Sequence, residues 1–210
     1  GAALPGGSKT KYVEVCNTGG SDLVWSMSEN QDMMSTPVYE FLTIGKEQPD
    51  PRPGILGSGG PDMFGYTWVD SDDPGGPVYD WVDISAVGTP TFEGYSDDGN
   101  RGPFPIDFPF EFYGETFTEF NVCSNGWLSF TSTSTVYSNQ PLPNAGAPEN
   151  MLALYWDDMV VDPGDGGEIY YYFDGTRLIV QYEIRRIGTT GAPPFYSMQA
   201  ILYPDGSIVY

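Results

Sequence analysis

The segment Tyr170-Tyr171-Tyr172-Phe173-Asp174-Gly175-Thr176-Arg177 decides the fold class of this chain. Four aromatic residues with high strand propensity run directly into Asp-Gly, a pair that readily adopts positive φ in a two-residue turn. The segment therefore predicts a β-hairpin with a type I′ turn at its Asp-Gly step. A second signal, Tyr203-Pro204-Asp205-Gly206, predicts a type I turn closed by a glycine bulge.

Short runs of β-branched and aromatic residues continue this pattern on both sides of the hairpin. They are separated by Gly and Pro, 27 and 19 of the 210 residues, as is typical of many-stranded antiparallel structures. No convincing amphipathic helix interrupts them. We therefore predict an all-β fold, with an antiparallel β-sandwich over residues 62–210. Its predicted strands are Met63–Val69, Val78–Ile84, Phe108–Phe112, Glu119–Val122, Trp127–Phe130, Met151–Trp156, Glu168–Phe173, Arg177–Ile184, Tyr196–Tyr203 and Ser207–Tyr210.

Residues 1–48 predict a separate, smaller β unit with an extended N-terminal arm. Strand patterns cover residues 11–16, 23–28 and 38–44. Three strands make a weak independent domain, so we expect this set to pack on the sandwich. Residues 49–61 are rich first in Pro and then in Gly, which predicts a linker.

The charge of the chain excludes several classes of function. It carries 29 acidic and 8 basic residues, a net charge of −21, and no histidine. Nucleic acid and anionic membranes would repel it. The sequence contains no run of 18 apolar residues, so it predicts no membrane-spanning helix. Without histidine, neither a Ser-His-Asp nor a Cys-His site can be built. We expect a non-catalytic protein; a secreted hydrolase with paired carboxylates is the least favoured alternative.

The two cysteines, Cys16 and Cys123, leave two interpretations open. They are either buried free thiols or, in an oxidising extracellular setting, a disulfide. A disulfide between them would close a long loop and contribute roughly 4–5 kcal/mol in the chain-entropy model. It would also tie the N-terminal unit to the sandwich.

Acidic residues gather in predicted loops and at strand ends, where Ca²⁺ could find its six to eight oxygen ligands. The alternative is that they are solvated turn residues. An EF-hand is excluded, because Pro74 and Trp81 occupy two of its ligand positions after Asp70. Asp97-Asp98 forms one further acidic pair. The candidate calcium ligands are Asp70, Asp72, Asp73, Asp157, Asp158, Asp162 and Asp165.

Aromatic residues in or beside predicted loops could stack on sugar rings. Core packing in a sandwich explains most such residues equally well, so both interpretations stay open. The residues concerned are Tyr79, Trp81, Tyr95, Tyr113, Tyr137 and Tyr155.

Several motifs resemble those of the nidogen-like β module of bacterial secreted and cell-surface proteins. These are Phe112-Tyr113-Gly114, then Ser124-Asn125-Gly126-Trp127-Leu128-Ser129-Phe130, then Trp156-Asp157-Asp158, and finally the hairpin Gln199–Ile208. The resemblance covers roughly residues 62–210. One departure is Cys123, at a position that is usually small and uncharged. Residues 15–25 are similar to part of an Ig-like module. The resemblance implies a β-rich extracellular module without catalysis, and no particular ligand.

Together these observations predict an extracellular or cell-surface structural protein, a sandwich with an Ig-like strand set packed on it. Because an incomplete N-terminal unit and an open C-terminal edge would leave backbone groups unpaired, we expect strand addition between copies, giving a filament. The partners are then copies of the chain or other surface proteins. The alternative is an adhesion or carbohydrate-binding module of a larger surface protein.

Overall fold

Strands and loops make up almost all of the described chain, which confirms the all-β prediction. The computed structural model describes residues 57–140, 142–189 and 196–210. The predicted unit of residues 1–48, most of the linker 49–61 and Cys16 lie outside these residues. The chain divides into two units, Gly1–Val78 and Tyr79–Tyr210. In the first, the described part contains a small antiparallel pair, β1 (Ser58–Gly59) and β2 (Trp68–Val69).

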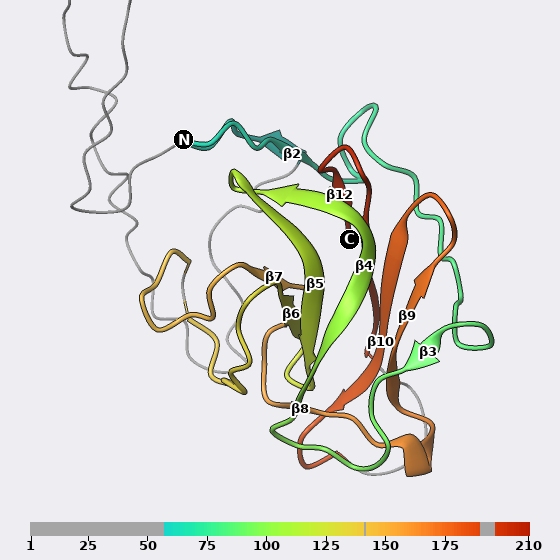
Figure 1. Ribbon diagram of the computed structural model, residues 1–210. Coiled ribbons are helices and arrows are strands. Elements are labelled where there is room, and N and C mark those ends of the chain that lie inside the picture. The colour runs from blue at the N-terminus through green and yellow to red at the C-terminus, as the bar shows by residue number, and fades with distance from the viewer. Residues whose placement is uncertain (1–56, 141, 190–195) are drawn as a thin grey trace, which may run out of the picture. The chain divides into compact units, whose positions relative to one another are not determined.

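The second unit contains two antiparallel sheets that face each other, as Figure 1 shows. The six-stranded sheet has the order β12-β11-β10-β9-β3, and β8 also pairs with β10. Its strands are β3 (Thr89–Pro90), β8 (Met159–Val160), β9 (Glu168–Phe173), β10 (Leu178–Arg186), β11 (Tyr196–Leu202) and β12 (Ile208–Val209). The four-stranded sheet has the order β4-β5-β6-β7. Its strands are β4 (Asn100–Phe112), β5 (Glu115–Cys123), β6 (Trp127–Ser129) and β7 (Met151–Ala153).

The core lies between these sheets and follows the two-residue alternation of the strands. On β10 the inward residues Leu178, Val180, Tyr182 and Ile184 are fully buried. Aromatic rings join the layers: the ring centroids of Phe104 and Tyr171 lie 4.9 Å apart, and those of Phe108 and Phe173 lie 5.9 Å apart. The hydroxyl of Tyr182 donates to the carbonyl of Trp127 at 2.8 Å. These contacts confirm the β-sandwich.

The hairpin that decided the fold class forms between β9 and β10, with Phe173 paired to Leu178. The predicted type I′ turn is wrong, however, because only Gly175 of the Asp-Gly pair has a positive φ. The Asp174 carboxylate instead accepts from the backbone N–H groups of Thr176 and Arg177, at 2.9 Å and 3.0 Å. This side-chain cap stabilises a four-residue loop. The second predicted turn is confirmed, since the N–H of Gly206 donates to the Tyr203 carbonyl at 3.0 Å.

Two strand predictions differ from the structure in ways that bear on function. Strand β4 starts eight residues before the predicted Phe108 and continues through three prolines. It does so with register shifts between Arg101 and Phe104 and between Pro105 and Phe110. The prediction of a strand at Val78–Ile84 is wrong: this segment has no regular secondary structure and pairs with no described strand.

Candidate functional site

The three predicted calcium ligands of the first unit lie in one tight loop. The Asp70 carboxylate accepts from the backbone N–H of Gly57 at 3.1 Å and from that of Asp72 at 3.0 Å. The N–H of Gly76 closes the same loop on the Asp73 carbonyl at 2.8 Å. Asp70 therefore serves the turn, as Asp side chains commonly do.

Asp162 and Asp165 do come together, but around an arginine. Asp162 caps the short 3₁₀ turn η2 (Pro163–Asp165) by accepting from Gly164 N–H at 3.2 Å. The Arg185 guanidinium forms an ion pair with Asp162 and lies 3.3 Å from the Asp165 carboxylate. A guanidinium from β10 thus occupies the place that the sequence prediction gave to a metal ion.

The adjacent residues Asp157 and Asp158 have different environments. The Asp157 carboxylate faces Arg186 at 3.7 Å and accepts from the N–H of Asp158 at 2.9 Å. The Asp158 carboxylate lies instead beside Asp97 and Asp98. One carboxylate oxygen from each of these three residues lies within 4.8 Å of the other two. We call Asp97, Asp98 and Asp158 the carboxylate cluster.

The Ser-Asn-Gly motif between β5 and β6 holds the loop that carries two of these carboxylates. The Ser124 hydroxyl accepts from Gly99 N–H at 2.9 Å and donates to the Asp97 carbonyl. The Ser124 N–H donates to the Gly99 carbonyl at 2.8 Å. Asn125 donates to the Asp98 carboxylate at 3.0 Å, and its side-chain oxygen accepts from Met159 N–H at 2.9 Å. Fully buried themselves, Ser124 and Asn125 therefore connect the Asp97–Asp98 loop to the segment that carries Asp158.

Gly126 completes the motif by a close backbone approach. Its carbonyl accepts from the N–H groups of Leu154 and Tyr155 at 3.2 Å and 3.0 Å. A Cβ placed on Gly126 would lie 2.0 Å from the Tyr155 carbonyl oxygen, and φ is +77°. Only glycine fits this position without rearrangement. The sequence motifs at 124–126 and 154–158 thus form a single contact.

The electrostatics of the carboxylate cluster favour a cation. Asp97 Oδ1 is buried and has no hydrogen-bond donor among the described residues. Burial, followed by the neighbouring Asp98 and Asp158 charges, raises the pKa of Asp97 above its ordinary value. A hard, oxygen-preferring cation such as Ca²⁺ would relieve both the missing partner and the repulsion. The sequence prediction included Asp158 but not Asp97 or Asp98 among the ligands; the Ser124-Asn125-Gly126 motif was the available signal.

Cys123 is fully buried in a cluster with Trp127 and Trp156, and it has no disulfide partner among the described residues. Burial raises its pKa to about 12, so it has no nucleophilic thiolate at neutral pH. Because Cys16 lies outside the described residues, the predicted disulfide stays a prediction.

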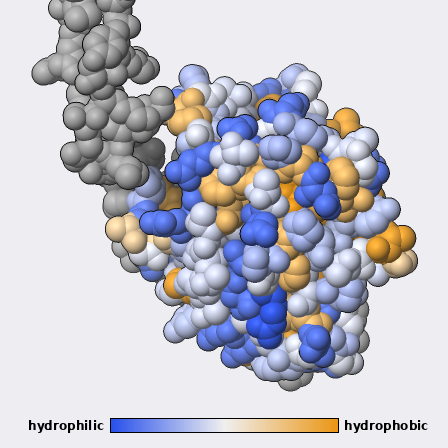
Figure 2. All heavy atoms as spheres, in the orientation of Figure 1, coloured by the Kyte–Doolittle hydropathy of each residue, from blue (hydrophilic) through white to orange (hydrophobic). Residues whose placement is uncertain are grey.

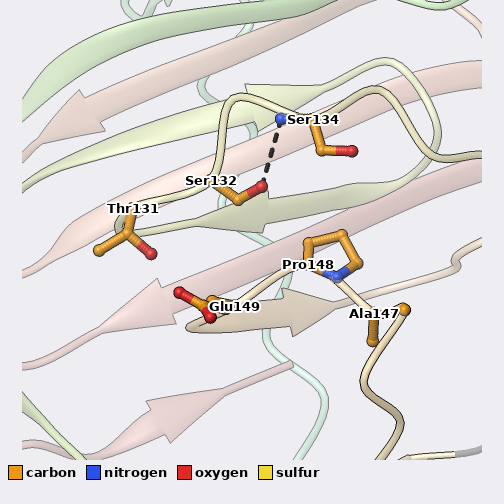
Figure 3. Close-up of a pocket in the computed structure, with 7 residues that line it drawn as sticks. Thr131, Ser132, Ser134, Ala147, Pro148 and Glu149 are labelled. Carbon is orange, nitrogen blue, oxygen red and sulfur yellow. Dashed lines mark hydrogen bonds between the residues drawn. The ribbon is translucent and has the colours of Figure 1, made fainter.

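A shallow hollow lies between the loops that follow β6 and precede β7 (Figure 3). Three hydroxyls line it, from Thr131, Ser132 and Ser134, with Glu149 as the single carboxylate. The Ser132 hydroxyl accepts from Ser134 N–H at 3.2 Å, so its geometry follows from the local turn. These lining residues contain neither a pair of carboxylates nor a base beside a nucleophile.

The loop aromatics of the sequence prediction do not form one cluster: Tyr113 makes an edge-to-face contact with Phe112 at 4.7 Å, and Tyr155 forms a second pair. Tyr155 stacks on Tyr196 with ring centroids 5.1 Å apart and the planes inclined by 25°. Each of the two is 42% exposed. Figure 2 shows hydrophobic residues interleaved with hydrophilic ones over the visible face.

The fold and the motif contacts define an all-β sandwich module whose loops carry the carboxylate cluster. The family model described as "NIDO related" matches residues 78–210, more than half of the chain. The chain therefore belongs to the nidogen-related family, as the sequence motifs implied. This membership indicates an extracellular or cell-surface module. No solved structure matches the chain, and among the described residues no helix is long and apolar enough to span a membrane.

Proposed function

We propose that this protein is a non-catalytic structural module of the cell surface that assembles with copies of itself by strand addition. One observation carries the proposal: the margins of the six-stranded sheet are only partly paired. Strand β12 pairs with β11 at Ile201 and Leu202 alone. The other side of β11, which faces away from β10, is open over Tyr196–Ala200, where no strand of the described residues pairs with it. Unpaired backbone donors and acceptors of this kind invite another strand.

The opposite margin of the six-stranded sheet, at β9, is also only partly paired. Strand β3 pairs with β9 at Tyr170 and Tyr171, and Thr91 N–H donates to the Ile169 carbonyl at 3.0 Å, so no described strand pairs with this margin of β9 at Tyr172 and Phe173. Two margins of one sheet, each covered by a two-residue strand, permit head-to-tail addition. Such contacts repeat without closing and therefore give a filament.

The four-stranded sheet ends at β4 on one side and at the three-residue β7 on the other. Its long β4 edge is protected against pairing, which favours the six-stranded sheet as the site of addition. Strand β4 forms that edge, and Pro103, Pro105 and Pro109 remove three backbone donors from it. Two register shifts and the positive φ of Asp107, +68°, bend it further. Proteins commonly protect long edges against pairing in this way.

Light scattering and negative-stain microscopy of the whole chain test the proposal. A lysine at the open edge of β11, in the variant Tyr196→Lys, should reduce the assembled fraction, because an edge lysine opposes strand pairing. Tyr137→Lys, at a 49% exposed loop position, is the matched control. A chain that remains monomeric across salt and calcium conditions, or that assembles equally well with either lysine, contradicts strand addition at β11.

As a second part of the function, we propose that the carboxylate cluster binds Ca²⁺. The support is the buried, partnerless Asp97 Oδ1 between two further carboxylates. Calcium should raise the melting temperature of the chain, since a ligand that binds only the folded state stabilises it. Asp97→Asn should abolish this increase and Asp72→Asn should retain it. The reverse result would place the ion in the loop of the first unit.

The stacked pair Tyr155–Tyr196 favours the alternative function, a carbohydrate-binding or adhesion module, since exposed rings can stack on sugars. Glycan-array binding that disappears in Tyr155→Ala would support this function. Binding that persists, or none at all, leaves the structural module as the better account.

A further inference from the structure

The first segment of the second unit lies across the outer face of the six-stranded sheet. We call Tyr79–Phe92 the arm. Its middle, Val82–Ile84, has no regular secondary structure, and its last part includes β3, the strand at the margin beside β9 in Figure 1. The sequence alternation in this segment predicted a strand. The structure shows why it was misleading, because the arm is held largely by side chains of the sheet beneath it.

Two glutamines act as a substitute strand edge for the arm. Gln181 and Gln199 are cross-strand neighbours on β10 and β11, and both are buried. Gln199 accepts from Val82 N–H at 3.4 Å and donates to the Val82 carbonyl at 2.6 Å. Gln181 accepts from Ile84 N–H at 2.9 Å and from the Gln199 amide, also at 2.9 Å. The two amides thus bind the backbone of the arm as a neighbouring strand would.

Apolar contacts and a carboxylate complete the docking. Ile84 is 1% exposed and packs between Ile179 and Ile201. At the end of the arm, the buried Glu168 carboxylate accepts from Phe92 N–H at 3.0 Å. The arm therefore contributes an anchor, a clamped backbone and an edge strand to the same sheet.

A short exposed connection joins the arm to the remainder of its unit. Glu93, Gly94 and Tyr95 are all exposed, and nothing lies within 4 Å of where a Cβ on Gly94 would be. The arm's polar contacts are made to β9, β10 and β11, so an identical arm from another molecule could make the same set. Exchanging identical elements between copies costs little in contact energy.

We infer that the arm Tyr79–Phe92 is the strand donor in assembly, and that it docks on the sheet of a second copy of this chain. This inference rests on the proposed self-assembly and names its partner contact. In the exchanged form, β3 of one copy extends the sheet of the next at β9. Each copy then donates one arm and accepts one arm, and the series stays open-ended when a copy donates to a different molecule from the one whose arm it accepts. The Gln181–Gln199 pair selects the donor by its backbone, while the Ile179–Ile201 cleft selects Ile84.

A cysteine trap separates an arm docked on its own sheet from an arm docked on another copy. Two full-length single variants, Ile84→Cys and Ile201→Cys, are co-expressed in an oxidising compartment, both with Cys16→Ser, and only one carries a purification tag. Neither variant can form the new disulfide within one chain. The double variant Ile84→Cys/Ile201→Cys is the geometric control. The pair Ile84→Cys with Ile179→Cys repeats the test on the neighbouring strand.

If arms exchange, tagged material should contain the untagged chain as a disulfide-linked heterodimer, at a level that rises with the assembled fraction. Assembly in microscopy without a heterodimer, while a double variant forms its internal bond, would overturn arm exchange and leave strand addition at β11 standing. Monomers without any heterodimer would overturn both.

Discussion

The contact between Gly126 and Tyr155 gives a sharp test of how the family motif works. Replacing Gly126 by Ala places a Cβ 2.0 Å from the Tyr155 carbonyl oxygen and 2.8 Å from its carbon, both backbone atoms. The backbones must separate until the first distance reaches ordinary van der Waals contact. That separation disrupts the hydrogen bonds that the Gly126 carbonyl accepts from Leu154 and Tyr155.

The magnitude follows from three contributions. A left-handed φ costs an L-residue about 1–2 kcal/mol. Weakening two backbone hydrogen bonds costs about 1 kcal/mol each, and overpacking adds about 1–3 kcal/mol. We therefore expect Gly126→Ala to destabilise the second unit by about 4–7 kcal/mol, a large share of the stability of a typical domain.

Gly188→Ala is the matched control. Gly188 has the same φ, +77°, and nothing lies within 4 Å of its Cβ position. The Gly188→Ala variant should lose only about 1–2 kcal/mol of unfolding free energy, the cost of the left-handed φ. Urea denaturation followed by near-ultraviolet circular dichroism measures both, through midpoint shifts at constant slope. Equal losses in the two variants would refute the contact, and a slope change would indicate that the unfolding transition itself had changed.

Three further predictions follow from single contacts and from charge. Burial raises the pKa of Glu168 above its ordinary 4.5. Between pH 4.5 and this raised pKa, Glu168 holds a proton in the folded protein that it releases in the unfolded protein, so stability should fall as pH rises through this range. Glu168→Gln should flatten the decline in pH-dependent melting curves. Tyr182→Phe removes the hydrogen bond to the Trp127 carbonyl and should cost about 1 kcal/mol in urea denaturation, with Tyr137→Phe unchanged. The net charge of −21 opposes association, so light scattering should record more assembly as salt rises from about 10 mM to about 1 M; assembly that weakens with salt would mean that specific ion pairs drive it.

Local patterns predicted the strands that obey local rules. The Asp174-Gly175 step and the Tyr203–Gly206 turn located both C-terminal hairpins, because turn chemistry acts within a few residues. The predicted turn type of the first hairpin was wrong, since the Asp174 carboxylate caps the loop and the sequence does not reveal which N–H groups donate to a carboxylate. Strand β4 was truncated in prediction, because prolines argue against a strand interior and only an edge position tolerates them.

The candidate site was harder to predict, because it depends on partners distant in sequence. Asp162 and Asp165 were expected to bind a metal ion, yet Arg185 reaches them from another strand. Asp157 and Asp158 are consecutive, and their side chains still serve different neighbours. Asp97 enters the cluster only because Ser124, in a different loop, holds its backbone. Counting acidic residues therefore named carboxylates that the fold places in separate surroundings, and of the candidate ligands only Asp158 lies in the carboxylate cluster.

The arrangement around Ser124 and Asn125 would link folding to the proposed cation binding. These side chains are neutral and fully buried, and their polar atoms connect the Asp97–Asp98 loop, the β5–β6 turn and the segment at Met159. Because the hydrogen bonds fix the backbone, they keep three carboxylates together against their mutual repulsion. A bound cation would relieve a strain that the motif itself imposes. Asp97→Asn should consequently raise stability without calcium and lower it with calcium, relative to the unmodified chain, and melting curves in chelator and in calcium measure this crossover. A variant that is less stable in both conditions would mean that Asp97 has a structural role in the loop, independent of any ion.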